Sequence, residues 1–262
     1  MPAAPRLHVD TALSAGLELA LPDNAARHVQ VLRLQPGAAL VLFDGHGGEW
    51  GAEVLQMGRR KVLARVQVRL DVECELRTAV TLALGMPANE RMDALIEKAT
   101  ELGAARIQPL VCERSVLRLA GERAERKAAH WQAVAVAACE QSGRNRVPEV
   151  ALPMPFGEWL IAFADAVVSA ENDAKTARPI QSACRLMLSL DSAARPLLSQ
   201  VGTQRPLAIT LLSGPEGGIS PAEQTLALQH GFVPVSLGPR VLRADTAPLA
   251  ALACLAAMEE VP

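Results

Sequence analysis

Aromatic side chains are scarce in this 262-residue chain, which contains four Phe, three Trp and no Tyr. A protein that reads single-stranded nucleic acid by stacking bases on aromatic side chains would need more of them. If the chain binds a nucleic acid, arginine side chains, backbone groups and the shape of the surface must therefore supply most of the recognition.

Clustered cysteines and long apolar runs are also missing. The five cysteines are scattered singly, which argues against both a disulfide framework and a zinc site: Cys74, Cys112, Cys139, Cys184 and Cys254. No stretch approaches the roughly 18 uninterrupted apolar residues of a membrane span. His8 and Asp10 interrupt any apolar signal core near the N-terminus. We therefore expect a cytoplasmic protein without a membrane or metal partner.

The charge is small in total and uneven along the chain. The net charge is −2, with an excess of Lys and Arg over Asp and Glu in residues 1–70 and the opposite balance in the remainder. The basic excess is concentrated in Arg59, Arg60 and Lys61, followed by Arg65 and Arg69. Such a run fits a solvated strand edge or a grip on phosphate groups. Charge alone permits RNA binding without requiring it.

Residues 1–72 are expected to form a small β-barrel. Segments 6–9, 17–20, 39–43, 49–56 and 61–68 have the character of strands, and a helix is expected from Pro22 to about residue 32. The turn Asp-Gly-His-Gly-Gly at residues 44–48 superficially resembles a glycine-rich nucleotide site. The next segment alternates like a strand, whereas a nucleotide site needs a helix there. The sequence therefore predicts a hairpin turn.

From residue 79 onward, strands alternate with helices. Strands are expected at residues 81–84, 106–111, 166–169, 185–190, 207–212 and 232–237, and helices at 89–102, 122–142 and 246–259. This alternation is typical of a mainly parallel sheet. Residues 73–262 are therefore expected to form an α/β domain.

A glycine-rich loop is the strongest single motif. The sequence Ser-Gly-Pro-Glu-Gly-Gly-Ile-Ser at residues 213–220 follows an apolar strand. It precedes a helix start with Ser220 at the N-cap, Pro221 at the first position and Glu223 at the capping-box position. Glycines allow positive φ angles and the close approach of a ligand. Taken alone, the segment could also be an ordinary turn between a strand and a helix.

A second loop of the same kind follows the next strand. The sequence Leu-Gly-Pro-Arg-Val-Leu-Arg-Ala-Asp-Thr-Ala at residues 237–247 places apolar Val241 and Leu242 between two arginines, just before a helix. The apolar pair fits either a pocket wall or an anchor in the core. Arg243 fits either a surface cation or a group that holds a substrate.

The two loops together resemble those of the SPOUT superfamily and, within it, the family of 16S ribosomal RNA N3-uridine methyltransferases. Further segments match that family in register: His-Val-Gln-Val-Leu-Arg at 28–33, Phe-Asp-Gly at 43–45, Lys-Ala-Thr-Glu-Leu-Gly at 98–103, Glu-Arg-Ser at 113–115, Glu-Gln-Ser-Gly-Arg at 140–144 and Val-Pro at 147–148. The family usually has Glu where Asp245 stands. Segment 165–185 fits the family poorly and is expected to be a variable loop.

The resemblance implies a PUA-like β-barrel at residues 1–72 and a SPOUT methyltransferase domain with a trefoil knot and a parallel sheet at residues 73–262. It implies that S-adenosylmethionine binds within three loops, with the glycines keeping side chains out of its space. The residues implied for cofactor binding are Leu190, Gly214, Glu216, Gly217, Gly218, Leu237, Gly238, Val241, Leu242, Arg243, Thr246 and Ala247. It also implies a homodimer formed through the knotted domain.

For catalysis, a cation would stabilise the anion that develops on uridine when N3 attacks the methyl group. Arg243 is the first candidate and Arg144 the second, while Glu216 or Asp245 would accept a proton or order the loop. The residues implied for binding 16S ribosomal RNA or the small subunit are Arg6, Arg27, Arg33, Arg59, Arg60, Lys61, Arg114, Arg144 and Arg146.

Other functions remain open on the sequence alone. A non-catalytic assembly factor would keep the fold without methyl transfer. A related methyltransferase would act on transfer RNA or on ribose 2′-hydroxyls. An unrelated α/β enzyme would use the same loops to bind phosphate, although the sequence offers no pairing of a nucleophile with a base that would support it.

Overall fold

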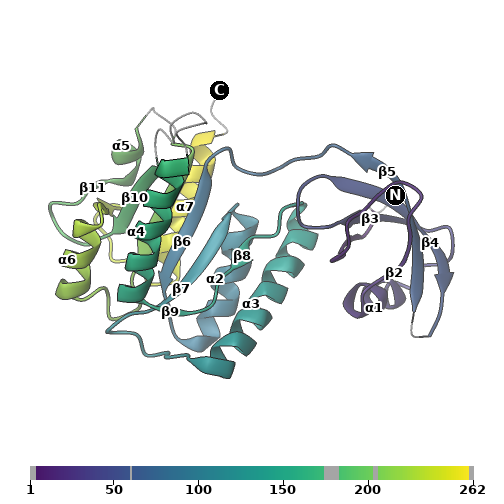
Figure 1. Ribbon diagram of the computed structural model, residues 1–262, viewed down its shortest axis with the longest axis horizontal. Helices are drawn as coiled ribbons and strands as arrows, with labels where there is room; N and C mark the ends of the chain where they lie inside the picture. Colours follow the sequence, from purple (N-terminus) through teal and green to yellow (C-terminus); the bar gives the residue numbers. More distant parts are fainter. Residues whose placement is uncertain (1–3, 60, 174–182, 203–205, 260–262) are drawn as a thin grey trace. The chain divides into compact units, whose positions relative to one another are not determined.

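The computed structural model describes residues 4–59, 61–173, 183–202 and 206–259 (Figure 1). Contacts divide the chain into two compact units, which are described separately. Unit 1 comprises Met1–Glu75 together with Val136–Val147, and unit 2 comprises Leu76–Ala135 and Pro148–Pro262.

Unit 1 is a five-stranded sheet with one helix. Its elements are β1 (Arg6–His8), β2 (Glu18–Ala20), α1 (Asp23–Val31), β3 (Ala39–Phe43), β4 (Glu49–Met57) and β5 (Val62–Leu70). The strand order is β1-β3-β4-β5-β2, with β1 parallel to β3 and the other pairs antiparallel. Inward-facing Leu42, Val54 and Val62 pack against Val29 of α1 in one apolar core. The predicted strands, the helix and the hairpin turn at residues 44–48 are confirmed.

A distant segment of the chain completes unit 1. The backbone N–H of Gly47 donates to the carbonyl of Asn145 at 3.0 Å, and the backbone N–H of His8 donates to the Glu140 carboxylate at 2.9 Å. Arg6 pairs with Glu49 and donates to the Asn145 side chain at 2.7 Å. The compact unit thus reaches beyond the predicted domain of residues 1–72 at Glu75 and takes in Val136–Val147. The division into 1–72 and 73–262 stays a prediction.

Unit 2 is built on a parallel sheet. Its strands are β6 (Ala79–Gly85), β7 (Arg106–Val111), β8 (Glu149–Val150), β9 (Met154–Pro155), β10 (Ala183–Leu188), β11 (Arg195–Pro196), β12 (Ala208–Ser213) and β13 (Val233–Ser236). The strand order is β11-β13-β10-β12-β6-β7-β8, with β9 beside β7. All pairings in this part of the described chain are parallel, as the alternation of strands and helices predicted.

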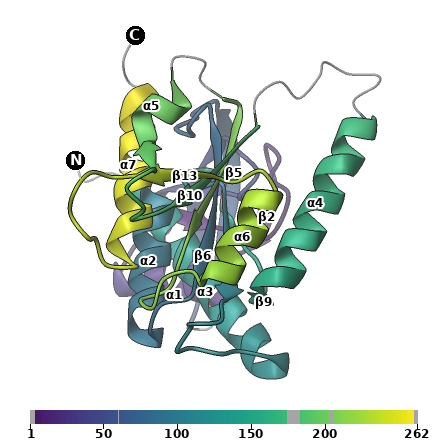
Figure 2. The ribbon, with the colours of Figure 1, turned by 90° about the vertical axis from the view of Figure 1, so that its left-hand side faces the viewer.

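Helices cover both faces of this sheet (Figure 2). Helices α2 (Asn89–Glu101) and α7 (Thr246–Glu259) lie on one face, while α4 (Phe156–Asp173) and α6 (Pro221–Gln229) lie on the other. The remaining helices are α3 (Gly121–Ser142) and the short α5 (Leu197–Val201). Under α4, Trp159 packs against the rings of Phe156, Phe163 and Phe232.

Helix α4 corrects one expectation. The sequence predicted a strand at residues 166–169 and a variable loop at 165–185, but α4 continues to Asp173 and β10 begins at Ala183. Short apolar runs do not distinguish a strand from a helix. The helix signal lies upstream, where Phe156, Trp159, Leu160 and Phe163 recur at the 3- and 4-residue spacing of one helix face. Residues 174–182 lie outside the described part.

A polar contact joins α2 to α3 within unit 2. The Asp93 carboxylate accepts from the indole nitrogen of Trp131 at 3.0 Å and lies 2.7 Å from Nε2 of His130. Partial burial raises the pKa of Asp93, but these hydrogen bonds outweigh it and hold the pKa below its ordinary value of 3.8. The ionised carboxylate therefore helps to hold the two helices together.

None of the helices in the described part of the chain combines the length and apolar character that a bilayer crossing requires. Within the same residues, no group of three or more His, Cys, Asp or Glu side chains is placed to hold a metal ion.

Candidate active site

A cavity lies where three neighbouring parallel strands end. Strands β13, β10 and β12 are adjacent in the sheet although they are not consecutive in sequence, so the loops that follow Leu188, Ser213 and Ser236 meet at one edge. Ligands of open α/β sheets bind at this edge. The cavity has a volume of about 600 Å³, within the range of small-molecule sites.

The cavity gathers most of the residues that the resemblance implied for cofactor binding. Those that line it are Leu190, Gly214, Glu216, Gly217, Gly218, Leu237, Gly238, Val241, Leu242, Arg243 and Ala247. Thr246 instead faces a second groove between α2 and α7. The structure thus brings the two predicted loops and the end of β10 to a single site.

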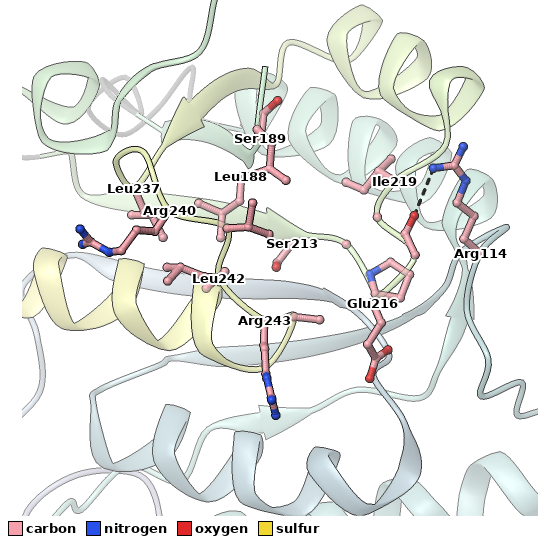
Figure 3. Close-up of a pocket in the computed structure, with 18 of the residues that line it drawn as sticks. Arg114, Leu188, Ser189, Ser213, Glu216, Ile219, Leu237, Arg240, Leu242 and Arg243 are labelled. Atoms are coloured by element: carbon pink, nitrogen blue, oxygen red, sulfur yellow. Dashed lines mark hydrogen bonds between the residues drawn. The ribbon is translucent and has the colours of Figure 1, made fainter. Parts of the chain in front are cut away.

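One side of the cavity is apolar and the other is polar. Figure 3 shows Leu188, Leu237 and Leu242 together on one side, with Arg114 and Glu216 on the other. Val241 and Leu190 also line the cavity, yet their side chains are 78% and 73% exposed. Two apolar side chains so open to solvent beside a cavity are suited to contact an apolar part of a ligand.

The glycine-rich loop is held in place at its far end. Ser220 Oγ accepts from the backbone N–H of Glu223 at 3.3 Å, and the Glu223 carboxylate accepts from the backbone N–H of Ser220 at 2.9 Å. This is the predicted capping box, with Pro221 in the first turn. The same carboxylate accepts from the backbone N–H of Glu113 at 2.8 Å. The start of α6 therefore fixes the 213–220 loop against the segment after β7.

Arg114 contacts this loop directly. Its Nη1 donates to the Gly217 carbonyl at 3.1 Å, the contact drawn in Figure 3. A Cβ atom on Gly217 would lie only 2.8 Å from the Arg114 Cβ. Gly217 thus makes room for the neighbouring protein segment as much as for a ligand. Arg114, implied as an RNA contact, also supports the cavity wall.

Glu216 is turned toward helix α2. Its carboxylate accepts from the backbone N–H of Ala88 at 3.0 Å and lies 3.8 Å from Nη1 of Arg91. An acceptor at this position satisfies one of the free N–H groups at the helix start. Of the two roles considered for Glu216, proton acceptor or loop-ordering group, these contacts favour the second.

The two cations considered for catalysis lie in different environments. Arg243 lines the cavity, and its side chain is exposed. Arg144 belongs to unit 1, where its side chain is buried and donates to Glu75 at 2.9 Å. Because its charge is already paired in a buried site, Arg144 is poorly suited to stabilise a substrate anion.

Cys112 is buried close to the glycine-rich loop. Burial, together with the nearby Glu223 carboxylate, raises the pKa of its thiol to about 12. A thiol of this kind is protonated at neutral pH and chemically inert.

Apart from Arg114, which lines the cavity, the described cations among the predicted RNA contacts fall into three groups. Arg27, Arg33, Arg59 and Lys61 are exposed on unit 1. Arg6 and Arg144 form ion pairs within unit 1, with Glu49 and Glu75 respectively. Arg146 is exposed beside Glu73 at 3.0 Å. Arg60 lies outside the described residues.

Sequence reasoning missed several lining residues. Leu188 ends strand β10, and Ser213 and Ile219 were quoted within the glycine-rich motif but not assigned to the site. Arg240 was quoted within a motif but not assigned to the site. Arg91 lies on α2, far from the loops in sequence. The one sequence signal that could have singled it out is its position as a cation in the first turn of a helix, where the helix dipole disfavours positive charge.

Comparison with known proteins gives the site its context. A family model described as RNA methyltransferase domain matches residues 74–256, and one described as RNA methyltransferase PUA domain matches residues 21–67. The ribosomal RNA small subunit methyltransferase E of Synechocystis is 38% identical over 88% of this chain and 70% of its own length.

Solved structures show the same similarity. The ribosomal RNA small subunit methyltransferase E of Neisseria gonorrhoeae, bound to S-adenosylmethionine, is 33% identical with a TM-score of 0.83, covering 98% of both chains. A Legionella pneumophila structure in complex with the same cofactor is 32% identical with a TM-score of 0.84, again over 98% of both chains. The predicted fold class, a SPOUT methyltransferase domain after a PUA-like domain, is confirmed, while the knot stays a prediction. The chain belongs to the RNA methyltransferase family that includes the ribosomal RNA small subunit methyltransferases E.

Proposed function

We propose that this chain transfers the methyl group of S-adenosylmethionine to N3 of a uridine in 16S ribosomal RNA. The observation that carries the proposal is the cavity formed by three loops after adjacent parallel strands, in a chain similar over almost its whole length to small-subunit ribosomal RNA methyltransferases. Solved relatives bind S-adenosylmethionine.

The cavity residues fit this cofactor. Leu188, Leu237 and Leu242 offer an apolar surface for the adenine ring, and backbone groups of residues 237–242 would read its edge. At Gly218, with φ of 70°, an added Cβ would meet nothing within 4 Å, so the backbone borders open space. When bound, the cofactor supplies a methyl group activated by its sulfonium charge.

The chain's own contribution is mainly positioning. Glu216 and Arg114 fix the glycine-rich loop, which in turn sets where the nucleophile can approach. Uridine N3 must lose its proton to become a good nucleophile. Arg243, exposed at the cavity, would stabilise the negative charge that develops on the base. No histidine lines the cavity among the described residues, and the proton acceptor is left unassigned.

The exposed cations Arg27, Arg33, Arg59 and Lys61 of unit 1 would bind the RNA backbone, with Arg114 beside the cavity. The target base must leave its stack to enter the cavity. We further propose a homodimer formed through the knotted domain and a cytoplasmic location, where the small subunit is found.

Nucleoside mass spectrometry of ribosomal RNA tests the proposal. In cells that lack this protein, 3-methyluridine should disappear from small-subunit RNA and return with the intact gene, but not with a Gly217→Val form. Persistence of 3-methyluridine together with loss of another methylated nucleoside would leave the cofactor assignment and refute the uridine N3 assignment. Unchanged nucleosides with no cofactor binding would favour an assembly factor.

A further inference from the structure

Arg91 occupies an unusual place for a cation. It lies in the first turn of α2, after the N-cap residue Ala88, where the helix dipole favours negative groups and disfavours positive ones. The N-cap residue Ala88 provides no side-chain cap at this end. A positive charge at a position where the helix dipole disfavours it indicates that contacts with other parts of the fold favour the arginine there.

Two carboxylates from other parts of the chain lie near Arg91. Its Nη1 atom lies 3.8 Å from Oε1 of Glu216 and 4.0 Å from Oδ1 of Asp245. Glu216 belongs to the glycine-rich loop and Asp245 to the loop that precedes α7, so one guanidinium faces a carboxylate from each of two cavity loops.

Both distances exceed hydrogen-bond length, which for a charged pair is about 2.7–2.9 Å. The Oδ1 atom of Asp245 is buried and has no hydrogen-bond partner among the residues that the structure describes. The guanidinium is thus close enough to attract both carboxylates but bonded to neither. A modest inward movement of the two loops would form the missing hydrogen bonds.

The two carboxylates also need a cation between them. Each lies within 4.0 Å of the same nitrogen, so they can be no farther apart than about one Debye length, roughly 8 Å at physiological ionic strength. Without Arg91, two negative charges would face each other across the junction of the loops and tend to separate them.

We infer that Arg91 is a positioning residue that ties the 213–219 loop and the 237–247 loop to helix α2, and that its two ion pairs tighten when the cofactor is bound. The inference rests on the proposed function, because it takes these loops to be the cofactor site. Arg91 acts through the loops and need not touch the methyl group.

Calorimetric titration of the full chain with S-adenosylmethionine tests this role. Arg91→Met should raise Kd about tenfold, since each exposed pair is worth roughly two- to fivefold in affinity. Arg91→Lys, which keeps the charge, should recover most of the affinity. Arg91→Met combined with Asp245→Asn should bind better than Arg91→Met alone, because one of the two repelling charges is gone. That recovery would also exclude simple misfolding of the single variant.

Lys98→Met is the matched control. Lys98 lies on the same helix, but its ion pairs are with Glu97 and Glu101 of α2 itself, so its removal should leave Kd unchanged. In steady-state kinetics, Arg91→Met should raise KM for S-adenosylmethionine without lowering kcat at saturating cofactor. A generally damaged fold would lower both the affinity and kcat.

Two outcomes separate this inference from the proposed function. If the unsubstituted chain binds S-adenosylmethionine and Arg91→Met binds it equally well, the positioning role is overturned and the cofactor site stands. If the combined variant is weaker than Arg91→Met alone, the repulsion argument is also overturned. If the unsubstituted chain binds no cofactor, the proposed function itself fails, and the role of Arg91 fails with it.

Discussion

Substitution of Gly217 by alanine tests whether the contact with Arg114 shapes the cavity. The added Cβ would lie 2.8 Å from the Arg114 Cβ and 3.2 Å from the Arg114 carbonyl oxygen. Carbon atoms in contact prefer about 3.5–4.0 Å, so the two segments must separate by roughly 0.7 Å. This movement stretches the 3.1 Å hydrogen bond from Arg114 to the Gly217 carbonyl.

The size of the effect follows from the cost of overpacking, typically about 1–3 kcal/mol. Both segments are exposed and can move apart in the free protein, which relieves most of this cost. Cofactor binding requires the loop to return to its native position, and we expect that return to cost about 1–2 kcal/mol of binding free energy. That energy corresponds to an increase of roughly 5- to 30-fold in Kd for S-adenosylmethionine. Gly217→Val should have a larger effect, because it adds two further methyl groups.

Isothermal titration calorimetry measures Kd, and thermal unfolding reports stability in parallel. Gly121→Ala is a matched control in the same unit, because Gly121 has φ of 53° and open space around its Cβ position. It should cost about 1 kcal/mol of stability through backbone strain without changing Kd. A Gly217→Ala protein that binds the cofactor as tightly as the unsubstituted chain would refute the idea that Arg114 fixes this loop.

Three further predictions concern catalysis, RNA binding and pH. Arg243→Ala should lower kcat by about 10²-fold with little change in cofactor Kd, whereas equal loss in both would make Arg243 a binding residue. Arg59→Ala together with Lys61→Ala should weaken RNA binding and reduce the salt slope by about 0.7–0.9 for each phosphate group that the variant no longer neutralises; an unaltered slope would return these side chains to an ordinary solvated surface. Asp93→Asn should destabilise the protein near neutral pH, because the lowered pKa of Asp93 means that its ionised form stabilises the fold. That contribution is complete above the unfolded-state pKa and is lost as pH falls through the folded-state pKa, so melting temperatures of the two proteins should converge below pH 3.8. A difference that persisted there would contradict the assignment.

Local signals in the sequence were sufficient for the cavity loops. The capping box of Ser220 and Glu223 and the glycines at 214–218 specify a strand, a turn and a helix from neighbouring residues alone. Strand ends in a parallel sheet meet at one edge, so most cavity-lining residues followed from these motifs. The family resemblance then supplied the identity of the ligand, which the motifs alone did not.

Features that depend on distant contacts were not predicted. Helix α4 was missed because its helical face begins at Phe156, before the segment that was interpreted as a strand. Arg91 and Glu216 are 3.8 Å apart in space but lie in widely separated parts of the sequence. The buried ion pair between Arg144 and Glu75 joins residues far apart in the sequence, so no local pattern predicted it. Arg144 was therefore considered for catalysis.

The contribution of residues 136–147 to unit 1 has a consequence for biosynthesis. The backbone of Val147 donates to the Gly45 carbonyl at 3.2 Å, and Asn145 receives the Arg6 side chain. At elongation rates of about 5–20 residues per second, the ribosome needs several seconds to proceed from Glu75 to Val147. During that interval the first strands leave the ribosome while Asn145, which accepts from both Arg6 and Gly47, is still unsynthesised. Unit 1 therefore cannot reach its final form in the order in which it is encoded, and its completion must wait for synthesis of the end of helix α3.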